Sequence, residues 1–114
     1  MIVQKYKKGD IYYASLQGKG SEQQGYRPVL IIQNDTGNKF APTLIVCPIT
    51  SRTKNDLPTH VKVGTDILNK ESIILTEQIL TIDKSRITGD KVGCLDKESL
   101  EEVEKAVKIS LSIT

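Results

Sequence analysis

The fold is decided by the stretch Arg27-Pro28-Val29-Leu30-Ile31-Ile32-Gln33-Asn34. Its middle is an unbroken apolar run, which indicates a central strand buried on both faces. Pro28 disfavours helical geometry for the residue before it, so we expect Arg27 to be extended at the start of this strand. Residues 34–38 are expected to form the turn that ends the strand.

Further short strands are expected on both sides of this stretch. Before it, the Tyr- and Ile-rich run 11–16 predicts a first strand, and the polar segment 17–26 with its three glycines predicts a long loop. After it, strands are predicted at 43–49, 59–63, 72–76, 78–82 and 85–88, with a second polar loop at 51–56. Strands in series without intervening helices predict an antiparallel sheet closed into a barrel.

The end of the chain changes to a helical period. Asp96 is a suitable N-cap, and Leu100, Val103, Val107 and Leu111 recur at helical spacing. We therefore expect one amphipathic helix that packs its apolar stripe on the sheet. The fold class is mainly β with a C-terminal helix, and the 114 residues form a single domain, 1–114.

Composition and cysteine usage limit the class of protein. With 38% hydrophobic and 26% charged residues the chain is globular, and its few aromatic residues predict a core of Ile, Val and Leu. Cys47 lies in an apolar run and Cys94 is distant from it, so two free thiols are expected. No apolar run has the length of a signal peptide or a membrane span, which predicts a soluble, cytoplasmic protein without a membrane partner.

Several kinds of chemistry are excluded or unsupported by the sequence. His60 is the only histidine, which excludes an acid/base ribonuclease that needs two. His60 and the two cysteines lack zinc-ligand spacing, and no spacing brings acidic residues together for magnesium. The glycines of the first loop do not form a phosphate-binding loop. No metal and no cofactor are therefore expected.

Two polar residues at strand ends are candidates for a site. Arg27 begins a strand and Thr50 ends one, although a solvated arginine and a threonine that bonds its own turn would explain the same positions. The basic residues near loops and strand ends either line one groove or are scattered charge balanced by the 14 acidic residues; they are Lys19, Arg27, Arg52, Lys54, Lys84 and Arg86.

Four motifs in register resemble the MazF/PemK (Kid) toxins of the Gram-positive branch. They are Gly20-Ser21-Glu22-Gln23, the stretch 27–35, Leu57-Pro58-Thr59-His60-Val61 and Glu77-Gln78-Ile79-Leu80-Thr81-Ile82-Asp83. The resemblance implies an SH3-like antiparallel β-barrel of the CcdB/PemK type. It also implies a sequence-specific endoribonuclease of a type II toxin–antitoxin system, with Arg27 and Thr50 in the catalytic roles.

The chemistry implied by this resemblance needs no metal. The 2′-hydroxyl of single-stranded RNA attacks the adjacent phosphate and leaves a 2′,3′-cyclic phosphate and a 5′-hydroxyl, with a UACAU-like element as the expected site. The resemblance places RNA contacts at Lys19, Ser21, Glu22, Gln23, Ser51, Arg52, Lys54, Gln78, Lys84 and Arg86. Leu80 stands where relatives commonly carry a basic residue, so one phosphate contact is expected to differ.

The implied partners are a single-stranded RNA substrate, a MazE-type antitoxin and a second copy of the chain in a homodimer. Two other classes stay open from the sequence. One is a CcdB-like poison of DNA gyrase, and the other is a noncatalytic SH3-like module that binds RNA or peptide. Arg27 and Thr50 favour the nuclease.

Overall fold

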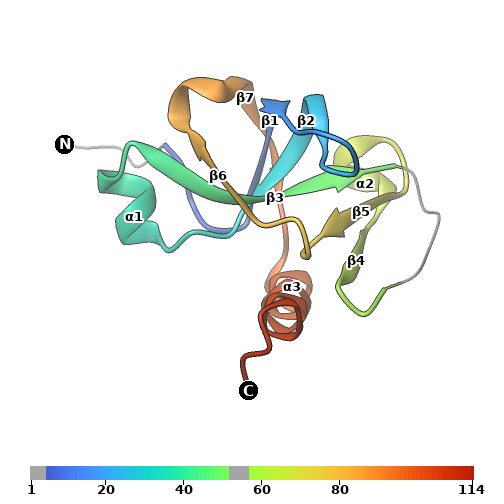
Figure 1. Cartoon of the computed structure of the whole chain (residues 1–114). Helices are drawn as coiled ribbons and strands as arrows, with labels where there is room; N and C mark the ends of the chain where they lie inside the picture. Colours follow the sequence, from blue (N-terminus) through green and yellow to red (C-terminus); the bar gives the residue numbers. More distant parts are fainter. Residues whose placement is uncertain (1–4, 52–56) are drawn as a thin grey trace.

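The computed structural model describes residues 5–51 and 57–114, so the expected RNA contacts Arg52 and Lys54 lie outside the described residues (Figure 1). In chain order the elements are β1 (Asp10–Gln17), β2 (Gln24–Ile31), α1 (Asp35–Phe40), β3 (Thr43–Thr50), β4 (His60–Val63), α2 (Thr65–Leu68), β5 (Ser72–Leu75), β6 (Leu80–Asp83), the 3₁₀ turn η1 (Lys84–Arg86), β7 (Ile87–Cys94) and α3 (Lys97–Ser110).

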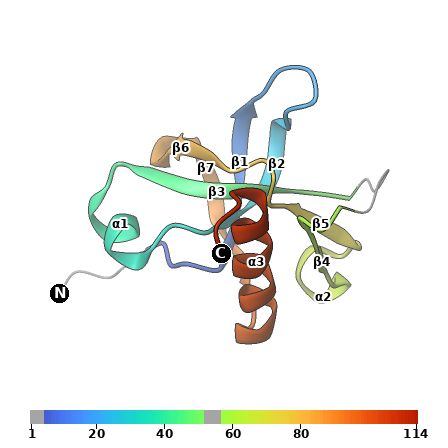
Figure 2. The same ribbon diagram turned by 60° about the horizontal axis from the view of Figure 1, so that its bottom comes forward.

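The strands form an antiparallel sheet in the order β4-β5-β3-β2-β1-β7, and β6 also pairs with β3. The β1–β2 hairpin sets Ala14 opposite Arg27, and the β2–β3 ladder sets Val29 opposite Pro48. Figure 2 shows this hairpin on the side of β3 away from α3. The mainly-β class with a C-terminal helix is thereby confirmed.

Closure of the sheet into a barrel is not observed. The path of paired strands described by the structure ends at β4 and β7. The reason lies in β3, which divides one edge between two partners: its first half, from Thr43 to Val46, pairs with β6, and its end, from Ile49 to Thr50, pairs with β5. The β4–β5 hairpin therefore leaves the direction of the main sheet instead of continuing round to β7.

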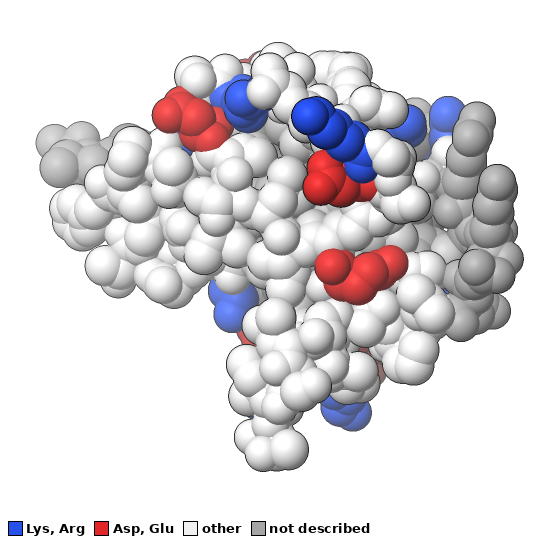
Figure 3. Space-filling view, in the orientation of Figure 1, with Lys and Arg blue, Asp and Glu red and all other residues white. Residues whose placement is uncertain are grey.

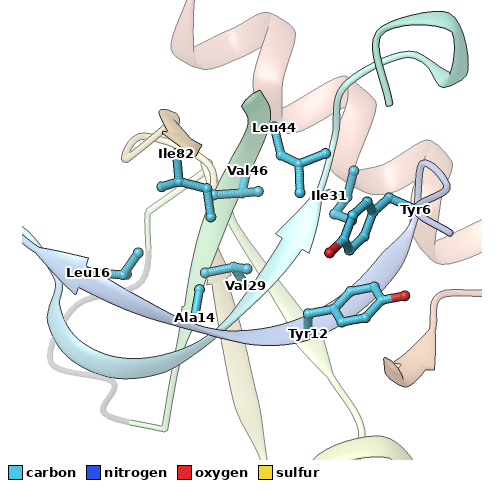
Figure 4. Close-up of a cluster of buried hydrophobic side chains, with 9 residues drawn as sticks. All are labelled: Tyr6, Tyr12, Ala14, Leu16, Val29, Ile31, Leu44, Val46 and Ile82. Atoms are coloured by element: carbon cyan, nitrogen blue, oxygen red, sulfur yellow. The ribbon is translucent and has the colours of Figure 1, made fainter. Parts of the chain in front are cut away.

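The two faces of the sheet bury separate apolar clusters. Figure 4 shows the first cluster, in which Ala14 and Val29 meet Leu44, Val46 and Ile82. The second cluster lies under α3 and comprises Ile11, Leu30, Cys47, Ile49, Val61, Val63, Ile74, Val103 and Ala106. Neighbouring residues of a strand contribute to opposite clusters because their side chains alternate. The expected Ile-, Val- and Leu-rich core is present.

Strand β2 begins at Gln24, inside the segment 17–26 that was expected to be a loop, whereas its apolar end is buried on both faces as expected. Only its last three residues, from Val29 to Ile31, are buried, and its first four are exposed. The ladder to β3 covers the same three residues and no earlier part of β2. The exposed beginning of β2 carries Arg27, so this departure bears directly on the site.

Of the described helices α1, α2 and α3, only α3 was predicted from the sequence. Helix α1 replaces a predicted turn, and the Asn34 side chain caps it by accepting from the Gly37 N–H at 2.8 Å. Helix α2 was not predicted and ends at Asn69, whose φ is 60°. Helix α3 is confirmed, with the Asp96 carboxylate accepting from the Ser99 N–H at 2.7 Å. None of the helices in the described part of the chain is long and apolar enough to cross a membrane.

Candidate active site

Arg27 and Thr50 lie together at the end of the β2–β3 ladder. Arg27 lies two residues before Val29 and Thr50 two residues after Pro48, and Val29 and Pro48 are the pair that ends the ladder. Both line a hollow of about 180 Å³. Arg27 is exposed and its Nε donates to the Gln24 carbonyl at 3.1 Å, whereas Thr50 is 7% exposed. The structure thus brings the two candidate residues to one place from strands that are distant in the sequence.

The same hollow contains Ser51, an expected RNA contact, and further residues that the sequence did not suggest. Ser51 follows directly after β3. The unexpected residues include Tyr13 and Tyr26 from the β1–β2 hairpin and Lys70 from the turn after α2. Ser72 donates its hydroxyl to the Lys70 carbonyl at 3.1 Å, which fixes that turn. Nothing in the local sequence marks Lys70, because only the pairing of β5 with β3 carries it to this hollow. Among the described residues that line it, the charged ones are all cationic.

A second hollow, of about 450 Å³, collects other expected RNA contacts. Its lining includes Glu22, Gln23, Gln78 and Arg86, together with Leu80. The Gln23 N–H donates to Gln78 Oε1 at 3.0 Å, and Arg86 donates to Gln17 Oε1 at 3.0 Å. Leu80 adds an apolar wall where a cation was expected from the resemblance. Four of the expected RNA contacts therefore line this second hollow.

The remaining expected contacts are placed differently. Lys19 and Ser21 lie in the β1–β2 loop, where the Lys19 N–H donates to Glu22 Oε2 at 2.8 Å. Lys84 is separate from them, since its Nζ donates to the Asn38 carbonyl beside α1 at 2.7 Å. In Figure 3 the Lys and Arg side chains lie in separate groups along the upper part of this face and beside α3, with acidic side chains near the upper groups, and most of this face is uncharged. The basic residues on this face do not form one continuous groove.

Two adjacent residues, Glu77 and Gln78, hold the loops around these hollows. Glu77 accepts from the Thr59 hydroxyl at 3.1 Å and lies 3.0 Å from His60 Nε2. Gln78 accepts from the Gln23 N–H and donates to the Ser21 carbonyl at 3.2 Å. His60 therefore has a structural role as the partner of Glu77. The segment before β6 connects the β1–β2 loop with the start of β4.

The two cysteines are free thiols, and the described residues offer no metal site. Cys47 and Cys94 are both free, as expected. Burial raises the pKa of the Cys47 thiol to about 12, so this thiol stays protonated at neutral pH. Within residues 5–51 and 57–114, no group of three His, Cys, Asp or Glu side chains is arranged to hold a metal ion.

The fold is that of solved bacterial toxins. A MazF from Deinococcus radiodurans superposes with a TM-score of 0.81 at 23% identity, over 94% of this chain and 96% of that one. An endoribonuclease from a mycobacterial species, solved in complex with its cognate antitoxin, gives 0.76 at 20% identity, over 98% of both chains. The chain thus has the overall fold of these solved toxins.

Sequence comparison narrows this class to one family. The model of the PemK-like, MazF-like toxins of type II toxin–antitoxin systems matches residues 7–111. Endoribonuclease EndoA of Bacillus subtilis is 50% identical over 111 residues, covering 94% of this chain and 95% of that protein. Endoribonuclease MazF of Staphylococcus saprophyticus is 49% identical over 111 residues, covering 94% and 92%. The chain belongs to the PemK/MazF toxin family, which confirms the resemblance seen in its motifs.

Proposed function

We propose that this chain, an endoribonuclease toxin of the MazF type, cleaves single-stranded RNA at a short sequence element by using Arg27 and Thr50, without a metal ion. One observation carries the proposal: the two residues line a single small hollow whose charged described residues are all cationic. A scissile phosphate is an anion whose charge grows in the transition state, so such a hollow suits it. The proposed element is UACAU-like.

The proposed reaction needs only what RNA and these two side chains supply. The 2′-hydroxyl attacks the adjacent phosphorus, the P–O5′ bond breaks, and a 2′,3′-cyclic phosphate and a 5′-hydroxyl form. The Arg27 guanidinium presents several donors that match the phosphoryl oxygens. Thr50 orients the phosphate or the 2′-hydroxyl by hydrogen bonding. The described residues that line the hollow include neither a carboxylate nor an imidazole. None of them is therefore assigned the removal of the proton from the 2′-hydroxyl.

Sequence choice is proposed to lie in the second hollow. Glu22, Gln23 and Gln78 offer amide and carboxylate groups there that can read the edges of unpaired bases, which duplex RNA hides. Arg86 in the same lining, and Lys19 and Ser21 in the adjoining loop, are proposed to contact the backbone. Lys84 is the least favoured of the expected contacts, because its ammonium is held beside α1.

We further propose a MazE-type antitoxin and a homodimer as partners, with the cytoplasm as the place of action. An acidic antitoxin tail would bind where RNA phosphates otherwise lie, and would fold as it binds. Apolar side chains at the end of α3 are exposed and offer area for a contact between copies; they are Ile109, Leu111 and Ile113. No described feature favours the gyrase-poison or noncatalytic alternatives.

The test is cleavage of a long RNA by purified protein in EDTA, with the cut sites and end groups mapped. We expect discrete cuts in unpaired segments that share a common sequence. Arg27→Ala and Thr50→Ala should each lower the rate by roughly a hundredfold or more, because a preorganised transition-state contact is lost. Lys39→Ala, an exposed cation in α1, serves as the matched control. Wild-type cleavage by Arg27→Ala, or a requirement for added metal, would overturn the mechanism.

A further inference from the structure

Two tyrosines form a stacked pair beside the proposed catalytic residues. The ring centroids of Tyr13 and Tyr26 are 4.8 Å apart and their planes differ by 13°. In the β1–β2 register Tyr13 pairs with Pro28 and Ser15 with Tyr26, so the two tyrosines are diagonal neighbours on one face. Tyr26 is 63% exposed. One side of its ring is thus fixed by Tyr13, and much of the rest is open to a further planar group.

A lysine accompanies this pair. Lys70 is exposed and lines the same hollow as both tyrosines, Arg27 and Thr50. Its backbone is held by the Ser72 hydroxyl, so the turn that presents Lys70 is fixed relative to β5. A stacking surface next to a cation is the combination by which proteins hold single-stranded nucleic acid. Neither feature depends on the amides of the second hollow.

The exposed beginning of β2 offers an RNA strand a path between Tyr26 and Arg27. Successive side chains alternate along a strand, so Tyr26 and Arg27 leave β2 on opposite faces. The ladder to β3 starts only at Val29, and so the edge of β2 before Pro28 is not covered by it. An RNA strand that crosses this edge can place a base against Tyr26 on one face and a phosphate at Arg27 on the other.

We propose that this hollow is a nucleotide subsite, in which the base next to the scissile phosphate stacks on Tyr26 and Lys70 contacts the neighbouring phosphate. The inference rests on the proposed function and adds two residues to it. Stacking on an aromatic side chain tolerates any base, so Tyr26 contributes affinity and alignment, and sequence choice stays with the second hollow. Tyr13 is a positioning residue that holds the Tyr26 ring.

The first experiment measures binding of a single-stranded oligonucleotide of the mapped cleavage sequence, made uncleavable by a 2′-deoxy nucleotide at the cut. Tyr26→Ala should weaken binding by roughly 10-fold to 100-fold, and Tyr26→Phe should keep most of it, because the ring remains. Phe40→Ala removes an aromatic side chain that is 72% exposed in α1 and should bind as wild type does. On cleavable RNA, Tyr26→Ala should raise KM by a similar factor.

Lys70 is tested by salt dependence. Lys70→Ala should weaken binding and reduce the slope of log K against log salt by about one, because one phosphate contact is lost. Tyr26→Ala should leave this slope unchanged, since stacking releases no counterion. Lys39→Ala is the control for removal of an exposed lysine outside the hollow. An unchanged slope in Lys70→Ala would remove Lys70 from the subsite.

A spectroscopic readout separates stacking from a structural role. The chain contains no Trp, so Tyr26→Trp introduces a single indole in the place of the stacking ring. The fluorescence of this indole should be quenched as the oligonucleotide binds. Phe40→Trp should give no such change. If the wild type cuts RNA but Tyr26→Ala binds normally and Tyr26→Trp is not quenched, the subsite is overturned and the proposed function stands. If the wild type does not cut RNA, both fall together.

Discussion

Asn38 is a polar side chain that the fold buries almost completely, with 2% of it exposed. It accepts from Gln33 Nε2 at 3.1 Å and donates to the Gln33 carbonyl at 2.9 Å. Gln33 Nε2 also donates to the Thr43 carbonyl at 3.0 Å. These bonds join the end of β2, helix α1 and the start of β3. The segment that was expected to be a simple turn is therefore a bonded corner of the sheet.

Removal of this side chain is expected to cost stability. In Asn38→Ala the Gln33 carbonyl loses the Asn38 donor and Gln33 Nε2 keeps only the Thr43 carbonyl, so the free energy of unfolding should fall by about 1–3 kcal/mol. Urea unfolding at neutral pH measures the change. Thr36→Ala, an exposed change in the same helix, should have little effect. Equal midpoints for the two variants would show that the Gln33 network does not stabilise the corner.

At the scale of single residues the sequence predicted part of the candidate site. Arg27 and Thr50 were expected, because each has a marked position at a strand end and a matching family motif. The sequence did not single out Lys70 and Tyr26, which line the same hollow, because an exposed lysine or tyrosine has no local pattern that sets it apart from solvated surface. Only the strand pairings show that four segments meet at one hollow.

The elements were predicted where their hydrophobic period is strong. Helix α3 and strands β1 and β3 were found nearly at their observed bounds, because apolar spacing and an N-cap residue mark them. Short helices such as α2 carry too few residues to show a period. The exposed first half of β2 depends on where β3 stops pairing, which one strand's composition does not contain.

The N-cap of α3 makes a prediction about pH. The Ser99 backbone N–H, and then its hydroxyl, donate to Asp96 and hold the pKa of that carboxyl below its ordinary value. Because the folded pKa is the lower one, the charged cap contributes fully above the unfolded pKa near 4, and the contribution is lost as pH falls through the folded pKa. Asp96→Asn keeps a capping side chain without this titration.

Thermal unfolding between about pH 5 and pH 2 tests the point. The wild type should lose more of its Tm over this range than Asp96→Asn does, while at neutral pH the wild type should be the more stable of the two. Glu102→Gln, which removes an exposed carboxylate further along α3, should follow the wild-type curve more closely. If the Tm of the wild type and that of Asp96→Asn fell equally between about pH 5 and pH 2, the Asp96 cap would not be the titrating group.

For the whole molecule, the proposed antitoxin and RNA sites make one joint prediction. If an acidic tail occupies the proposed catalytic hollow, RNA and antitoxin compete, and cations of the adjoining 51–56 segment serve both. Arg52→Glu with Lys54→Glu should then weaken both binding constants together by roughly tenfold or more, since two favourable charges become repulsive. Sedimentation should show an unchanged dimer mass. Full antitoxin affinity with lost RNA binding would point to inhibition from a remote site.

The adjacent residues Glu77 and Gln78 link two segments that are distant in the sequence. Gln78 holds Ser21 and Gln23 of the β1–β2 loop, and Glu77 holds Thr59 and the start of β4. A ligand that displaces either loop must break bonds to one short segment or carry that segment with it. If binding moves both segments, the change in free energy that the first movement imposes on the second equals the change that the second imposes on the first, whichever comes first.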